Sequence, residues 1–324
     1  MPEIIVVEAT NRCNLNCRHC NKNINDMGGT GPVDIDLRLL DHILEQTEPY
    51  KTRIVAITGG EPTLHSDWEG LIAVMERHDI DYTITSNGQN FKEAYKLIVQ
   101  GASQRFRGFA FSIDGATAET NDAIRGEGSF AKVKEAFRLA RMHGIPFSVQ
   151  VVVGTFNINE LEQIAKLADE AGALELNYTI MKPTLENAQY MLSPAQIDEV
   201  EKQIDSIREA HKRMAVTLAG TKTRYPLSVC RPQAMSMIGI DCHGHLRFCP
   251  DLSNYRGAAG ADSDIVDDLN TTPLQFALKE LSNKINKFCR SKIDWVMEGN
   301  LTSSEHDPCL YCVSHFNKYE CMEV

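Results

Sequence analysis

Short apolar runs alternate with amphipathic stretches of helical length from the N-terminus to about residue 185. The runs have the length and composition of strands, and the predicted strands are Ile4–Ala9, Arg53–Thr58, Tyr82–Thr85, Gly108–Ile113, Phe147–Val153 and Glu175–Ile180. The predicted helices between them are Leu37–Gln46, Trp68–Arg77, Phe91–Gln100, Phe130–His143 and Glu160–Glu170. Six βα units in series predict a parallel sheet with right-handed crossovers. Six is too few for the closed eight-stranded barrel, so we expect an α/β fold with a partial (β/α)6 barrel.

The pattern changes after the sixth predicted strand. Ser193-Pro194 is a helix start, and a helical segment is predicted from there to about Met214. From Cys230 onward the periodicity weakens, and seven of the ten cysteines fall in the last 95 residues. We therefore expect a barrel at residues 1–190, a helical linker or insert at 191–229, and a smaller cysteine-rich C-terminal domain at 230–324.

Composition excludes several classes of partner. The formal net charge is −11, from 44 acidic and 33 basic residues, which argues against nucleic acid or an anionic membrane as a partner. No stretch approaches eighteen consecutive apolar residues, so no membrane span is expected. The start Met1-Pro2-Glu3 lacks the features of a secretory signal, so we expect a cytoplasmic protein whose cysteines stay reduced.

The first predicted strand leads into the run Cys13-Asn14-Leu15-Asn16-Cys17-Arg18-His19-Cys20. Three thiolates at this spacing can hold three irons of a [4Fe–4S] cube and leave the fourth iron open. A catalytic metal needs an open position, whereas a structural site closes all of its positions. Zinc is the alternative, but it usually takes four ligands, and His19 lies at a spacing that suits no familiar zinc finger.

Glycine and polar residues follow the next predicted strands, where the function of parallel sheets gathers. They are Gly59-Gly60-Glu61-Pro62, Ser86-Asn87-Gly88 and Ser112-Ile113-Asp114-Gly115. Each has a simpler interpretation: a Gly-Gly pair forms a turn, Ser or Asn at a strand end caps it, and Arg125 is a solvated charge at a helix end. Their occurrence at successive strand ends is what these interpretations leave unexplained.

Together these motifs resemble the radical SAM superfamily over about the first 180 residues. The resemblance implies that Cys13, Cys17 and Cys20 bind a [4Fe–4S] cluster whose open iron binds S-adenosylmethionine (SAM). His19 stands where the family has an aromatic residue against the adenine, and the glycines of the GGEP motif let backbone approach the methionine amine. The expected SAM contacts are His19, Gly59, Gly60, Glu61, Pro62, Ser86, Asn87, Ser112, Asp114, Arg125, Asn157 and Ile180, with Arg125 pairing with the SAM carboxylate.

The C-terminal cysteines resemble the SPASM and twitch extensions of this superfamily, which carry auxiliary [4Fe–4S] clusters. The resemblance rests on the C-x13-G-x4-C element from Cys230 to Cys249 and on the pair Cys309 and Cys312. The spacing after Cys312 departs from the full SPASM pattern, and seven cysteines are too few for two closed cubes, so one auxiliary cluster is expected. Its expected ligands are Cys230, Cys249, Cys309 and Cys312, with a zinc site as the alternative. Cys242, Cys289 and Cys321 are left over, and Cys242 is the first candidate for a hydrogen-atom donor to a substrate radical.

The resemblance implies reductive cleavage of SAM to a 5′-deoxyadenosyl radical that abstracts hydrogen from a substrate, in an oxidoreductase or isomerase. We expect the substrate to be a ribosomally made peptide that is crosslinked or epimerised. The alternative is a sugar or cyclitol that is dehydrogenated or epimerised. An alternative of another class is a non-catalytic iron–sulfur electron carrier, against which the complete GGEP motif and Arg125 argue. The enzyme also needs a one-electron reductant such as flavodoxin or ferredoxin as a partner.

Overall fold

The computed structural model describes residues 2–20, 31–100, 104–182, 187–220, 227, 229–252, 264–299 and 308–316. The chain divides into two compact units. One comprises residues 1–12, 21–82 and 222–324, and the other comprises residues 13–20 and 83–221. Strand β3 (Asp81–Ser86) begins in the first unit and ends in the second.

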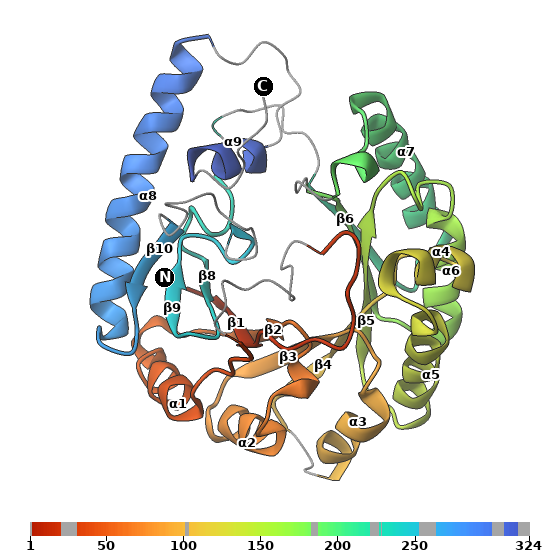
Figure 1. Cartoon of the computed structure of the whole chain (residues 1–324), viewed down its shortest axis with the longest axis horizontal. Coiled ribbons are helices and arrows are strands. Elements are labelled where there is room, and N and C mark those ends of the chain that lie inside the picture. Colours follow the sequence, from red (N-terminus) through yellow and green to blue (C-terminus); the bar gives the residue numbers. More distant parts are fainter. Residues whose placement is uncertain are drawn as a thin grey trace. The chain divides into compact units, whose positions relative to one another are not determined.

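In the first unit the strand order is β10-β9-β8-β1-β2, followed by the start of β3. The strands are β1 (Ile4–Thr10), β2 (Ile54–Gly59), β8 (Met237–Ile240), β9 (His245–Arg247) and β10 (Ile265–Asp268). Strand β1 pairs in parallel with both β2 and β8, whereas β9 and β10 are antiparallel additions. The helices are α1 (Leu37–Glu45), α2 (Trp68–Arg77), α8 (Leu274–Met297) and α9 (Pro308–His315), with short 3-10 turns η2 (Glu48–Tyr50) and η3 (Pro62–Leu64) (Figure 1).

In the second unit the strands β4 (Phe106–Ser112), β5 (Phe147–Val153), β6 (Glu175–Ile180) and β7 (Ala215–Ala219) follow the end of β3 in that order. The helices are α3 (Phe91–Gln100), α4 (Ala118–Arg125), α5 (Ser129–Met142), α6 (Leu161–Ala171) and α7 (Pro194–Ala210), with the 3-10 turn η4 (Ala188–Tyr190). Residues alternate between buried and half-buried along β5 and β6, and the pairs β4–β5, β5–β6 and β6–β7 are all parallel.

A stack of aromatic rings joins strands and helices in this unit. Phe109 and Phe111 lie on β4 with their rings stacked 5.4 Å apart, and Phe137 of α5 stacks on Phe147 of β5 at 5.3 Å. Phe111 also contacts both Phe137 and Phe147. Buried aromatic pairs stabilise a core beyond the apolar area that they remove from water. These contacts pack helix α5 against strands β4 and β5.

The six predicted strands and the α/β fold are confirmed, with strand ends within two residues of the prediction. Helix α4 is absent from the prediction because its sequence is mostly polar, and its buried residues include Asn121 and Arg125. Strand β7 lies in the segment where only helix is expected. It has five residues, none of them fully buried, and it directly follows a predicted helix, so periodicity does not distinguish it from that helix. No helix among the described residues has the length and apolar character needed to cross a membrane.

His211, which follows α7, joins two helices of the second unit through both of its ring nitrogens. Nδ1 lies 2.9 Å from an Asp169 oxygen, and Nε2 lies 3.1 Å from a Glu162 oxygen, both on α6. Burial by itself lowers the pKa of His211, but hydrogen bonds to the two carboxylates and their charges outweigh it and raise the pKa above 6.5.

We expect His211→Gln to lower the free energy of unfolding by about 1 kcal/mol at about pH 5.5, the upper range for partly exposed ion pairs. Because the folded pKa is raised, the contribution is complete below the unfolded pKa of 6.5 and is lost as pH rises through the folded pKa. Urea unfolding at several pH values measures this difference. His42→Gln is the control, because His42 and its partner Glu45 are both mostly exposed. A difference for H211Q that does not shrink at alkaline pH would contradict the ion-pair explanation.

Candidate functional site

The three-cysteine loop is attached to the second unit by its own backbone. The Arg18 N–H donates to the Ile124 carbonyl at the end of α4, at 2.9 Å, and the Cys20 N–H donates to the Cys17 carbonyl at 3.0 Å. The Asn87 side chain, just after β3, donates to Asn14 at 2.8 Å and lies 3.7 Å from the Cys13 sulfur. The loop therefore has a defined path with all three thiols half-buried on it.

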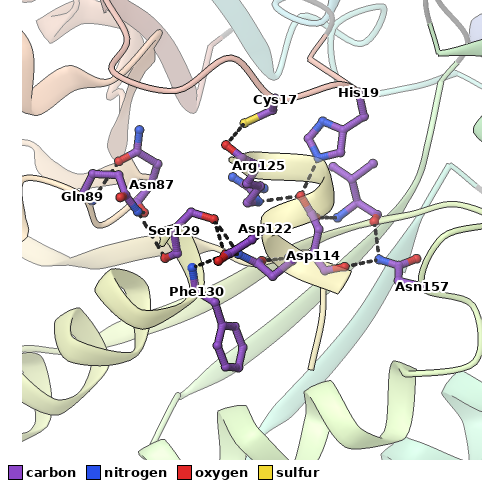
Figure 2. A network of polar contacts seen from close by, with 12 residues as sticks. Cys17, His19, Asn87, Gln89, Asp114, Asp122, Arg125, Ser129, Phe130 and Asn157 are labelled. Carbon is purple, nitrogen blue, oxygen red and sulfur yellow. Dashed lines mark hydrogen bonds and ion pairs between the residues drawn. The ribbon is translucent and has the colours of Figure 1, made fainter. Parts of the chain in front are cut away.

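Asp114, immediately beyond β4, is the hub of the polar network in Figure 2. Its side chain is fully buried, and one carboxylate oxygen lies 2.5 Å from both His19 Nε2 and Arg125 Nε. Its other oxygen accepts the Val152 N–H of β5 at 2.8 Å. One carboxylate thus connects the cysteine loop, helix α4 and strand β5.

The charge of Asp114 is stabilised by its partners. Burial by itself favours the protonated form, but the charges of Arg125 and His19, with the hydrogen bonds from His19 and the Val152 N–H, hold the pKa of Asp114 well below its usual range. Burial likewise opposes the charge of Arg125, yet Asp114 raises the pKa of Arg125 above its ordinary value. This is a buried ion pair, which is costly to break from either side.

Arg125 retains a donor at this site. Its Nε lies 2.5 Å from the Asp114 carboxylate, so the ion pair engages that side of the guanidinium. A guanidinium has five N–H donors, and its terminal amino groups carry the other four. A buried arginine beside the cysteine loop fits the expectation of an anionic partner such as the carboxylate of SAM.

The cysteine loop also fits an iron–sulfur cluster. Burial raises the pKa of Cys17 to about 12, against the opposing charge of Arg125. Smaller contributions in the same direction come from Cys20, Asp114 and Cys13. Iron must therefore displace the proton of the Cys17 thiol when it binds. No three histidine, cysteine or acidic side chains in the described ranges are gathered closely enough to hold a single metal ion. In a cube each cysteine binds a different iron, so the sulfurs need not converge on one point.

The GGEP motif belongs to the first unit, where its glycines have a packing role. The Gly60 N–H donates to the Thr10 carbonyl at 2.7 Å and the Glu61 N–H to the Arg12 carbonyl at 2.6 Å. A Cβ on Gly59 would lie 2.4 Å from the Thr10 oxygen, and a Cβ on Gly60 would lie 2.1 Å from the Arg12 oxygen. The glycines thus let the end of β2 approach the segment that leads into Cys13. Their predicted approach to the SAM amine stays a prediction.

The other expected SAM contacts occupy strand ends as predicted, but many of their hydrogen bonds close turns. Glu61 is buried and caps η3, which begins at Pro62, by accepting from Thr63. Ser86 Oγ accepts the Gly88 N–H, and Asn157 donates to the Asp114 and Val152 carbonyls. Ser112 ends β4 half-buried, and Ile180 ends β6 buried. Their contacts with SAM stay predictions.

Two residues near His19 are missing from the sequence expectations. Phe156 places its ring 6.1 Å from the His19 ring, and the fully buried Asn187 donates to the His19 carbonyl at 3.3 Å. Phe156 directly precedes Asn157, so the aromatic residue that follows strand five was the sequence signal that could have identified this contact of His19. Asn187 lies in a loop with no motif, and only the folded structure connects it to residue 19.

Four C-terminal cysteines lie on segments that pack together within the first unit. Cys309 and Cys312 are one turn apart on α9, and the Gln233 side chain, from the turn that starts at Cys230, lies 3.9 Å from the Cys312 sulfur. Cys249 follows Phe248, whose ring packs 4.7 Å from that of Phe316, just beyond α9. Their role as cluster ligands stays a prediction.

The remaining cysteines differ in setting. Cys242 is buried, 5% exposed, in the tight turn between β8 and β9. That turn is fixed by Asp241, which accepts the His243 and His245 N–H groups and pairs with Arg247 at 2.7 Å. Cys289 is half-buried on α8, and Cys321 lies outside the described residues. A cysteine with a purely structural role would be buried in the same way as Cys242. The role of Cys242 as a hydrogen-atom donor therefore stays a prediction.

A parallel α/β sheet with three half-buried thiols on the loop after its first strand defines a class of enzyme that binds a redox cluster at the carboxyl ends of its strands. The chain belongs to the radical SAM superfamily, whose family model matches residues 7–168. This superfamily uses a [4Fe–4S] cluster and SAM, so the recognition and cofactor predictions for the barrel are confirmed.

Comparisons with known proteins agree with this assignment. The chain is 33% identical over 184 residues to mycofactocin maturase MftC of Mycobacterium ulcerans, covering 56% of this chain and 48% of that protein. It is 26% identical over 250 residues to the AdoMet-dependent heme synthase of Methanosarcina barkeri, covering 75% and 69%. The structure of Streptococcus suis SuiB bound to S-adenosylmethionine shares the fold, with a TM-score of 0.72 and 15% identity over 89% of this chain and 68% of that one. The match thus spans about half the length of the maturases.

Proposed function

We propose that this chain is a radical SAM enzyme that crosslinks or epimerises residues of a ribosomally made peptide. The observation that carries the substrate class is the 33% identity with mycofactocin maturases, whose name describes the maturation of a precursor. SuiB, which has the same fold, is also known bound to its precursor peptide SuiA. Crosslinking would make the enzyme an oxidoreductase, and epimerisation would make it an isomerase.

The residues of the second unit have defined tasks in this proposal. Cys13, Cys17 and Cys20 hold the cluster and leave one iron open for SAM. Arg125, oriented by the contact of its Nε with Asp114, directs its terminal amino groups to the SAM carboxylate. When bound and reduced, the cluster and SAM together supply the 5′-deoxyadenosyl radical that takes hydrogen from the substrate. His19, held by Asp114 and the Asn187 contact, offers its ring to the adenine.

The C-terminal region holds one auxiliary [4Fe–4S] cluster on Cys230, Cys249, Cys309 and Cys312. The packing of Phe316, just beyond α9, against Phe248 and the contact of Gln233 with Cys312 support this ligand set. The enzyme works in the cytoplasm with an external one-electron reductant such as flavodoxin or ferredoxin. The net charge of −11 supports the absence of a nucleic acid or membrane partner.

The AdoMet-dependent heme synthases support a second candidate, because the match to them covers 75% of this chain against 56% for the maturases. A haem precursor is then the substrate. The sugar or cyclitol enzyme and the electron carrier remain alternatives with no observation in their favour beyond the resemblance itself.

A substrate assay distinguishes these candidates. The reconstituted full chain is incubated anaerobically with SAM, dithionite and the short peptides encoded beside its gene, in ordinary and deuterated water. We expect 5′-deoxyadenosine and, by mass spectrometry, loss of two hydrogens from one peptide for a crosslink or gain of one deuteron for an epimer. Consumption of a haem precursor or sugar with the peptides unchanged would refute the peptide assignment.

A further inference from the structure

Lys292 is a buried cation on α8, 3% exposed, and its Nζ has no hydrogen-bond partner among the residues that the structure describes. Lysine is almost never fully buried unless it is paired, because the ammonium group loses its hydration. Asp294, the nearest acid in the sequence, is exposed and does not hydrogen-bond to Lys292 Nζ. A charge in this position needs an anionic partner.

The Lys292 ammonium group contacts an aromatic ring. Its Nζ lies 5.9 Å from the centre of the Tyr311 ring of α9, at the limit of a cation–π interaction. Phe288 and Trp295, which lie one turn away on either side of Lys292, also pack on Tyr311, at 5.4 and 5.0 Å. A ring face does not satisfy the three N–H donors of an ammonium group.

The chain segments that meet at this aromatic contact also carry cysteines. Tyr311 lies between Cys309 and Cys312 on α9. Phe288 also packs on Phe248, the residue before Cys249, at 5.0 Å. The buried ammonium group is therefore linked through Tyr311 and Phe288 to the segments that carry three of the four thiols expected to bind iron.

We propose that Lys292 balances the negative charge of the auxiliary cluster and thereby raises its reduction potential and strengthens its retention. This inference rests on the auxiliary cluster of the proposed function. Four thiolates give such a cluster a net negative charge, and net charge, burial and nearby hydrogen bonds set the reduction potential of iron–sulfur clusters. The cluster supplies the anion that the described residues do not offer to Lys292.

The test uses the full chain with Cys13, Cys17 and Cys20 replaced by Ala, so that about four irons of a single auxiliary cube remain. Into this background we introduce Lys292→Met, which keeps the length of the side chain without its charge, and Lys292→Arg, which keeps the charge. Lys287→Met, an exposed lysine on the same helix, is the matched control. Redox titration followed by electron paramagnetic resonance measures the midpoint potential of each protein.

We expect K292M to lower the ratio of reduced to oxidised cluster about tenfold at a fixed potential, a shift of about 59 mV for a one-electron couple. K292R and K287M should stay near the parent. An unchanged potential in K292M with its irons retained would overturn the inference and leave the auxiliary cluster standing. A parent that holds no iron would instead refute the auxiliary cluster and this inference with it.

Stability provides a second measurement, because the effect of K292M should be stabilising in the iron-free protein and destabilising in the protein that holds the cluster. In the iron-free protein K292M should raise the urea midpoint, because it removes a buried cation that has no partner. In the loaded protein the same change should speed loss of iron to a chelator several-fold relative to K292R. A K292M protein that is equally stabilised with and without iron would also overturn the inference.

Discussion

The Cys13/Cys17/Cys20→Ala variant should form no 5′-deoxyadenosine above background and retain about four of the roughly eight irons expected for the wild-type protein. The thiols on the loop after β1 are the proposed ligands of the cluster that binds SAM, and alanine offers iron no electron pair. Cys17 is the most informative of the three, because its sulfur belongs to the network around Arg125 and Asp114. Anaerobic reconstitution, iron and sulfide analysis, and an assay with dithionite and SAM measure both effects.

Cys289→Ala is the control for this variant, since Cys289 is a half-buried cysteine outside both proposed ligand sets. It should keep all the irons and full 5′-deoxyadenosine formation. Formation of 5′-deoxyadenosine by the triple variant would refute the assignment of the three cysteines. A fully loaded wild-type protein that makes none would favour the electron carrier, and zinc in place of iron would exclude both.

Asp114→Asn should lower the free energy of unfolding by about 3–5 kcal/mol, the usual cost of leaving a buried charge without its partner. The change removes the charge that Arg125 and His19 both contact at 2.5 Å. It should also weaken SAM binding, because Arg125 and the cysteine loop lose the group that orients them. Urea unfolding and equilibrium binding of SAM to the reconstituted protein measure the two effects.

The double variant D114N/R125M separates the effect of Asp114 on the stability of the fold from its effect on SAM binding. Removing Arg125 as well relieves the uncompensated charge, so stability should recover while SAM binding stays weak. Asp122→Asn is the matched control on α4, because Asp122 caps the start of α5 through the Gly128 and Phe130 N–H groups and does not touch the cysteine loop. Normal SAM binding by D114N would show that Asp114 only stabilises the fold.

The sequence predicted the parallel strands because each is a short apolar run between polar segments, as in Phe147–Val153. It also predicted the cysteine loop, because Cys13, Cys17 and Cys20 lie within eight residues of one another at a spacing that suits an iron–sulfur cluster. Helix α4 was missed because its sequence is mostly polar, and strand β7 because it is short, half-exposed and directly follows a predicted helix. Their formation depends on contacts with neighbouring elements, such as the pairing of β7 with β6, rather than on local pattern.

By itself, the sequence determined the class of enzyme. The spacing of ligands that lie close together in the chain indicates the metal group that they bind, and glycine and polar residues mark the strand ends. Tertiary structure alone decided the electrostatics of the site. The ion pairs of Asp114 with His19 and Arg125 join residues 95 and 11 positions apart, and the burial of Lys292 against Tyr311 depends on how α9 packs on α8. Charge, burial and orientation arise from distances between segments, and no local pattern of residues encodes those distances.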